Sequence, residues 1–176
     1  MFDYTIETDR LILRPFTMDD VDDSYDVNLD PEVTRYTNDG GVKTYDEIQK
    51  IIHNVVHGDY EKYNYGRFAT VWKETNEFIG FSGLKYLPEY DEVDIGYRFR
   101  KKFWGMGIAT ESGKASLEFG FRVLGLNEIV GFVLPDNTAS SHVLKKLGFK
   151  FSHQFFDYGA DIDKYTLAKK DWEYEI

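Results

Sequence analysis

The stretch from Asp94 to Glu111 constrains the fold of this chain more than any other part of the sequence. It opens with apolar residues that alternate with other residues, which predicts a strand with one buried face: Val93, Ile95, Tyr97 and Phe99. Basic residues end this strand, namely Arg98, Arg100, Lys101 and Lys102. Gly105-Met106-Gly107 follows, and from there the apolar spacing predicts a helix. The chain must therefore place a glycine turn between a strand and the start of a helix.

This glycine turn has the chemistry of a phosphate site. Glycines leave main-chain amides uncovered, and the first turn of a helix offers unpaired N–H groups with a partial positive charge. Anions bind at such positions. The basic residues are notable because the formal net charge of the chain is −10, and salt screens distant charges beyond about 8 Å. We therefore predict that a phosphorylated cofactor binds here.

A glycine pair alone is more often a plain chain reversal, and the pattern lacks two better-known signatures. It is a poor match to the dinucleotide fingerprint, because Thr110 stands where the third glycine belongs. The sequence also contains no Gly-x-x-x-x-Gly-Lys-Ser/Thr loop for nucleoside triphosphates. The remainder of the chain must decide between these interpretations.

Length and composition narrow the class of protein. A chain of 176 residues suits one domain, 1–176. The absence of cysteine excludes disulfides and thiolate metal sites, and it is typical of a cytosolic protein. No apolar run approaches the ~18 residues of a membrane span, and no targeting signal is visible after Met1. The acidity argues against nucleic-acid binding. It suits a cationic substrate such as an amine, or simply solubility.

The pattern of elements predicts one mixed α+β domain with seven strands. We expect strands at 10–16, 66–73, 78–87, 93–100, 127–134, 149–156 and 162–168. Two capping boxes, Thr17 with Asp20 and Thr44 with Glu47, predict helix starts. Further helices are expected over 107–124 and from Asn137 to Gly148, where glycine suits a left-handed cap.

Five segments in order resemble the GNAT-fold N-acetyltransferases, in particular the RimJ/RimL-like branch. These segments are 7–16, 79–84, 94–97, the loop 102–109, and the end of the chain at 137–140 and 144–149. The resemblance covers nearly the full length. It implies a mixed α/β acyl-CoA acyltransferase fold, with a central, mostly antiparallel, splayed sheet of seven strands and helices on both faces.

The resemblance also implies acetyl-CoA as donor and a primary amine as acceptor, either a protein N-terminus or a small molecule, with direct transfer and no metal. The pyrophosphate would bind the main-chain amides of Gly105, Met106, Gly107, Ile108 and Ala109. The pantetheine arm would run along Phe99 and Arg100. Lys102 stands where Gln or Arg is usual, so the charge is kept but the bidentate fork is lost.

Acetyl transfer requires a neutral amine, and Asp94 is the predicted base. It aligns with an acidic position of the family that is usually Glu. Aspartate is one methylene shorter, so a bridging water is more plausible than direct contact. The alternative is a partly exposed strand aspartate beside Asp91 and Glu92.

Ser140 is the predicted acid that returns a proton to the CoA thiolate, because Leu144 occupies the place where many GNAT enzymes carry a tyrosine. The alternative for Ser140 is ordinary hydrogen bonding at a helix start. Asn137 would hold the pantetheine amide, bridge the strand and the helix through its side chain, or act as an N-cap. Gly96 marks a bulge that would splay the sheet, a close approach of another backbone, or simply a poorly packed position. Trp104 is expected to anchor the loop or to line the acceptor channel.

Histidine does not supply a metal site in this reading. His53 and His57 have i, i+4 spacing but lack a third ligand, so we predict surface or subunit contacts and no metal. A homodimer is a further expectation. The alternative function is a non-catalytic regulator that binds acyl-CoA through the same loop but lacks the base.

Overall fold

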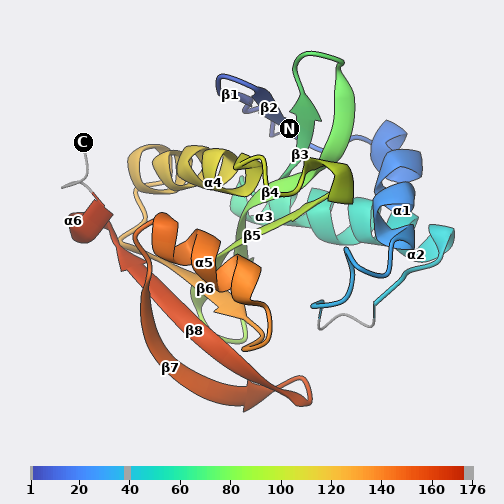
Figure 1. Ribbon diagram of the computed structural model, residues 1–176. Helices are drawn as coiled ribbons and strands as arrows, with labels where there is room; N and C mark the ends of the chain where they lie inside the picture. The colour runs from blue at the N-terminus through green and yellow to red at the C-terminus, as the bar shows by residue number, and fades with distance from the viewer. Residues whose placement is uncertain (1, 38–40, 173–176) are drawn as a thin grey trace.

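The computed structural model describes residues 2–37 and 41–172 and contains one eight-stranded sheet (Figure 1). Its strand order is β1-β2-β3-β4-β5-β6-β8-β7, and all neighbours are antiparallel except β5 and β6. The strands are β1 (Ile6–Glu7), β2 (Leu11–Arg14), β3 (Arg67–Trp72), β4 (Glu77–Leu87), β5 (Glu92–Phe99), β6 (Glu128–Val133), β7 (Lys150–Asp157) and β8 (Ala160–Ala168). The predicted mixed, mostly antiparallel fold is confirmed. The predicted count of seven strands is one too low, because the two residues of β1 also pair with β2.

Capping side chains mark the start of two of the helices, at Thr44 and at Asn137. The Thr44 hydroxyl accepts a hydrogen bond from the Glu47 N–H, and the Glu47 carboxylate accepts one from the Thr44 N–H at 2.7 Å. The helices are α1 (Val21–Leu29), α2 (Tyr45–Lys50), α3 (His57–Tyr63), α4 (Ile108–Glu118), α5 (Thr138–Lys146) and α6 (Lys169–Trp172). π-Helical turns at Ile51–Val56 and Phe119–Val123 join α2 to α3 and extend α4. None of the helices within the described ranges has the length and apolarity needed to cross a membrane.

Two cores cover the two faces of the sheet. On one face, α4 and α5 pack against buried strand residues such as Phe68, Leu84 and Ile95. On the other, α1 to α3 enclose a second cluster that includes Ala69 and Phe78 (Figure 1). Neighbouring residues of a strand point to opposite faces. The assignment of Ile95 to the first core therefore directs Asp94, Gly96 and Arg98 to the face covered by α1 to α3.

The sheet opens between β5 and β6. Their parallel pairing is recorded at one position, Asp94 beside Val130. On the other side of β5, the Arg100 N–H donates to the Ile79 carbonyl at 2.8 Å. Hydrogen-bonding direction alternates along an antiparallel pair. The main-chain groups of Tyr97 and Phe99 therefore face away from β4, toward the side of β6, where no described residue of β6 pairs with them.

Candidate active site

The glycine turn has the conformation that an anion site at a helix start requires. Gly105 and Gly107 have φ angles of 74° and 77°, which side chains rarely adopt, and Ile108 begins α4 immediately afterwards. Gly105, Met106 and Gly107 are exposed, and a Cβ atom at Gly105 would meet nothing within 4 Å. The uncovered amides at the start of α4 therefore fit a phosphate ester.

An ion pair holds this turn from the side of β1 and β2. The Glu111 carboxylate in α4 accepts from the Thr8 hydroxyl at 2.6 Å, the Arg10 N–H at 3.0 Å and the Arg10 Nε at 2.7 Å. Burial opposes the charge on Glu111, but these hydrogen bonds outweigh it and hold its pKa below the usual range. The start of α4 is thus fixed relative to the sheet without any ligand.

The basic residues before the turn are bound to the protein itself. Each contacts an acceptor on another element: Arg98 with Asn28 at 2.6 Å, Arg100 with Asp23 at 2.7 Å, Lys101 with Glu32 at 2.7 Å and Lys102 with Glu77 at 2.6 Å. These contacts fasten α1 and the beginning of β4 to the segment that leads into the turn. The sequence suggested cations available for an anion, whereas the structure engages them with protein groups. A role in CoA binding for Arg100 and Lys102 stays a prediction.

Trp104 anchors the loop at the end of β5. Its indole N–H donates to the Phe99 carbonyl at 2.9 Å, while 47% of the residue stays exposed. Of the two interpretations of Trp104, the structure therefore supports the anchor. The Phe99 side chain is buried in the core under α4.

Asp94 is not a free carboxylate. Its Oδ2 lies 2.6 Å from Arg67 Nη2, and its Oδ1 accepts from the Phe132 N–H on β6 at 3.3 Å. The side chains of Asp94 and Arg67 are only 13% and 16% exposed. Burial raises the pKa of Asp94, and although the charge and hydrogen bond of Arg67 lower it, the net direction is upward.

Arg67 was not among the residues that the sequence suggested. Its guanidinium lies across Gly96, where an added Cβ would sit 2.4 Å from Nη2. This explains the glycine without a bulge, since Gly96 pairs with Gly83 in a continuous β4–β5 ladder. The predicted bulge at Gly96 is therefore wrong. Register shifts occur elsewhere in the sheet, between β3 and β4 at Thr70 and Val71 and between β7 and β8 at Phe151 and His153.

The start of α5 brings the remaining predicted residues together. Asn137 Oδ1 accepts from the Ser140 N–H at 3.1 Å, so Asn137 is the N-cap of the helix. The Tyr97 hydroxyl, which the sequence did not single out as a site group, donates to the Ser140 carbonyl at 3.2 Å. Ser140 is half-buried, and its side chain also lies within hydrogen-bonding reach of the Tyr97 hydroxyl. Leu144 is buried against Gly131, on the inner side of the helix.

The two predicted catalytic residues thus flank the β5–β6 opening from opposite faces of the sheet. Asp94 belongs to the face of α1 to α3, where Arg67 also lies. Ser140 belongs to α5, and Tyr97 reaches it from the other face of β5. This arrangement can accept an amine from one face while a thiol leaves on the other.

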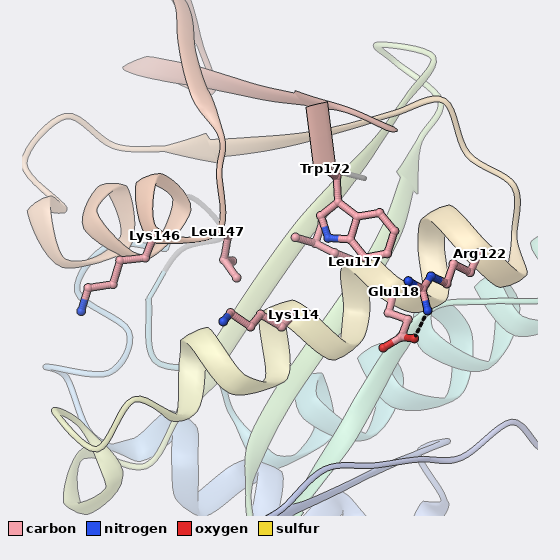
Figure 2. Close-up of a pocket in the computed structure, with 7 residues that line it drawn as sticks. All are labelled: Lys114, Leu117, Glu118, Arg122, Lys146, Leu147 and Trp172. Atoms are coloured by element: carbon pink, nitrogen blue, oxygen red, sulfur yellow. Dashed lines mark hydrogen bonds and ion pairs between the residues drawn. The ribbon is translucent and has the colours of Figure 1, made fainter. Parts of the chain in front are cut away.

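A separate groove lies between α4, α5 and α6 (Figure 2). It has a volume of about 280 Å³, and Leu117, Leu147 and Trp172 form its apolar part. Lys114 and Lys146 line it, and Arg122 is paired with Glu118 at its edge (Figure 2). None of the predicted site residues lines this groove. In the described ranges, no three His, Asp or Glu side chains are grouped so that they could hold a metal ion.

Comparison with known proteins identifies the family. Residues 10–150 match the acetyltransferase (GNAT) domain. The chain is 33% identical to the uncharacterized N-acetyltransferase p20 of Bacillus licheniformis, over 97% of this chain and 98% of that protein. It is 25% identical to the spermidine N(1)-acetyltransferase of Escherichia coli K12, over 82% and 77% of the two chains.

Solved structures agree with this result. The chain superimposes on a GNAT-family acetyltransferase from Bacillus anthracis with a TM-score of 0.82 and 24% identity, covering 95% and 99% of the two chains. The corresponding values for RimL, a ribosomal L7/L12 α-N-protein acetyltransferase in complex with coenzyme A, are 0.77 and 21%, with coverage of 94% and 98%. The chain belongs to the acetyltransferase (GNAT) domain family and is an acetyl-CoA-dependent N-acetyltransferase.

Proposed function

We propose that the acceptor is a primary amine of low basicity, with the α-amine of a peptide or protein as first choice and a small amine of similar pKa as second. The observation that carries this proposal is the state of Asp94. One of its oxygens pairs with Arg67 and the other accepts from the Phe132 N–H. Burial raises the pKa of this carboxyl, but both of its oxygens are occupied by protein groups, so it reaches the amine through water. Such a base suits an amine that loses its proton easily.

The free energies of deprotonation differ greatly between amines. The pKa of a lysine side chain, near ~10.4, lies about 3.4 units above pH 7, so removing its proton costs roughly 4.6 kcal/mol. An α-amine with a pKa near ~7.8 requires only about 1 kcal/mol. Asp94 with one intervening water is therefore sufficient to deprotonate an α-amine and poorly matched to a lysine side chain.

The proposed roles follow from the two faces of the opening. Asp94, facing α1 to α3, receives the amine proton through a water molecule. The Tyr97 N–H, turned away from β4, stabilises the negative charge on the thioester oxygen. Ser140, at the start of α5 beside the Tyr97 hydroxyl, donates a proton to the departing sulfur. Acetyl-CoA supplies the activated acyl group.

The donor would be held mainly by the main chain. We assign its pyrophosphate to the amides of the glycine turn and its pantetheine arm to the open side of β5. The residues concerned are Phe99, Arg100, Lys102, Gly105, Met106, Gly107, Ile108, Ala109 and Asn137. Because the four basic side chains before the turn already contact protein groups, the amides supply most of the binding free energy in this proposal.

The relatives support amine acetylation but differ in the acceptor that their names state. One named relative acts on spermidine, and one solved structure of the same fold acts on a ribosomal protein. The acceptor must therefore be decided by experiment. The cytosolic location and the homodimer stay predictions.

A thiol-release assay with matched acceptors tests the proposal. We would compare a lysine-free peptide with a free N-terminus, the same peptide with a blocked N-terminus and one lysine, and spermidine. The pKa difference between the two peptide amines is about 2.6 units. At neutral pH we therefore expect kcat/KM to favour the α-amine by at least ~100-fold. A preference for the lysine peptide or spermidine would contradict the choice of acceptor.

Variants test the residue roles in the same assay. Asp94→Asn keeps the size of the side chain and should lower kcat by about 10²- to 10⁴-fold, with unchanged CoA affinity by calorimetry. Alanine is less suitable because it would also remove the hydrogen-bond acceptor of the buried Arg67, which the asparagine amide oxygen retains. Binding of CoA by the wild type without acetylation of any amine in a broad panel would instead indicate a non-catalytic regulator.

A further inference from the structure

Arg67 occupies an unusual position on the face that the acceptor would enter. Its side chain lies over Gly96 and is only 16% exposed. The guanidinium donates to the Gly83 carbonyl, to the Asp94 carbonyl at 3.4 Å and to Asp94 Oδ2 at 2.6 Å. One cation from β3 thus crosses β4 and reaches β5, where it fixes the rotamer of a single carboxylate.

That carboxylate also connects β5 to β6. Asp94 is the β5 residue paired with Val130, and its Oδ1 accepts from the Phe132 N–H two residues further along β6. The side chain therefore continues the connection between the strands beyond the one position where the main chains pair. Toward Phe99 the strands have no further pairing in the described part of the sheet. Asp94 marks the closed end of the opening.

We propose that Arg67 is a positioning residue for acetyl transfer: by fixing the Asp94 carboxylate, it sets where β6 separates from β5 and hence where the thioester can lie. This inference rests on the proposed function. The distance from Asp94 to Phe99 is five residues of strand, or about 17 Å at ~3.4 Å per residue. A change at the closed end shifts the reacting carbonyl relative to the amine, and a misplacement of about 1 Å can cost ~100-fold in rate.

The charges around Asp94 support this role. Arg67 from β3 and Lys85 from β4 both favour its ionised form. Arg98 lies on the same face of β5, and Asp59 of α3, a helix that covers this face, interacts with Lys85 and Arg67. Among the contacts recorded between described residues, the hydrogen bond from a cation to the Asp94 carboxylate comes from Arg67. Loss of Arg67 should therefore raise the pKa of Asp94 and also release its rotamer.

Two substitutions at different residues disrupt the contact between Arg67 and Asp94. Arg67→Met removes the guanidinium. Gly96→Ala keeps it but places a methyl group 2.4 Å from Nη2, so that the flexible end of Arg67 must move away. Both variants should lower kcat by about 10- to 100-fold. The double variant should be no slower than Arg67→Met alone, because the methyl group has no guanidinium left to displace.

Structural readouts complement the rates. In ¹³C NMR of the Asp94 carboxyl group, the titration midpoint should move to higher pH in both variants, and the Phe132 amide signal should shift with it. Arg67→Lys should restore part of the rate. Lys85→Met is the matched control: it removes a nearby charge without removing a hydrogen bond. Lys85→Met should raise the titration midpoint of Asp94. It should leave kcat within about twofold of the wild type and the Phe132 amide signal unshifted.

Additive losses from Arg67→Met and Gly96→Ala would overturn the inference, as would full activity in both. If Arg67→Met does not fold, Gly96→Ala with Lys85→Met still decides the question. If the wild type acetylates no amine, the proposed function fails, whereas the NMR titration and the Phe132 amide still report whether Arg67 fixes Asp94. The two failures are therefore distinguishable.

Discussion

Gly107→Ala is the most direct test of the glycine turn. Gly107 has a φ of 77°, and a Cβ atom there would lie 3.8 Å from its nearest neighbour, Arg10 Nη2. Alanine therefore fits sterically, and its cost is conformational only. The left-handed conformation costs an L-residue about 1–2 kcal/mol. This cost must lower either the free energy of unfolding or the affinity for CoA.

If alanine keeps the left-handed conformation, the protein is less stable and the amides at the start of α4 stay in place. At about 2–4 °C per kcal/mol for a chain of this size, the melting temperature falls by roughly 2–8 °C. If alanine leaves that conformation, the amides turn away and the cost moves to the ligand. At 1.4 kcal/mol per tenfold, CoA affinity then falls about 5- to 30-fold. The two losses should sum to about 1–2 kcal/mol.

Calorimetric melting and CoA titration measure both terms, and Gly125 provides the matched control. Gly125 has a φ of 71°, and a Cβ there would meet nothing within 4 Å. It follows the π-helical turn after α4 and lies outside the predicted site. Gly125→Ala should therefore lower the melting temperature and leave CoA affinity unchanged. Wild-type melting and affinity in Gly107→Ala, or equal loss of affinity in both variants, would refute the reasoning.

Three further predictions concern single contacts. Glu111→Gln should destabilise the protein by about 2 kcal/mol at neutral pH, since hydrogen bonds to charged groups contribute ~1.5–3 kcal/mol each. Because folding lowers the pKa of Glu111, this stability is lost as pH falls through that pKa, so urea denaturation should show the variant and the wild type converging in acid. Ser140→Ala should slow acetyl transfer by about 10²-fold while the helix cap from Asn137 survives, which circular dichroism and the rate together would check; an unchanged rate would exclude Ser140 as the acid. Leu144→Ala should cost about 2–5 kcal/mol in chemical denaturation, because Leu144 is 1% exposed and packs on Gly131; a loss below 1 kcal/mol would contradict that packing.

Local patterns in the sequence were enough to place most elements. The alternation around Ile95 predicted β5, and Thr44 with Glu47 predicted the start of α2. The pair of glycines before Ile108 predicted a turn that leads into a helix, and both glycines adopt positive φ angles just before α4. These features depend on residues a few positions apart, which a sequence displays directly.

Contacts between distant segments were not predictable in the same way. Arg67 lies 27 residues before Asp94, and no local pattern links them. The basic residues were visible in the sequence, but their acidic partners Asp23 and Glu32 come from the helix region of the other face. Gly96 was recognised as special, yet the cause is a side chain from another strand. The missing information was three-dimensional, because each of these effects depends on which strands become neighbours.

The contacts of the basic residues have a consequence for the order of events in catalysis. Arg100 and Lys101 precede the glycine turn by a few residues and are tied to Asp23 of α1 and to Glu32 just beyond it. These two ion pairs therefore connect the glycine turn directly to α1. In the proposed arrangement, α1 covers the face that the amine enters, so binding of the coenzyme at the turn would act on α1 through these ion pairs, which favours an ordered sequence with the coenzyme first. Since exposed ion pairs weaken with salt, that communication between the two substrates should fade as ionic strength rises.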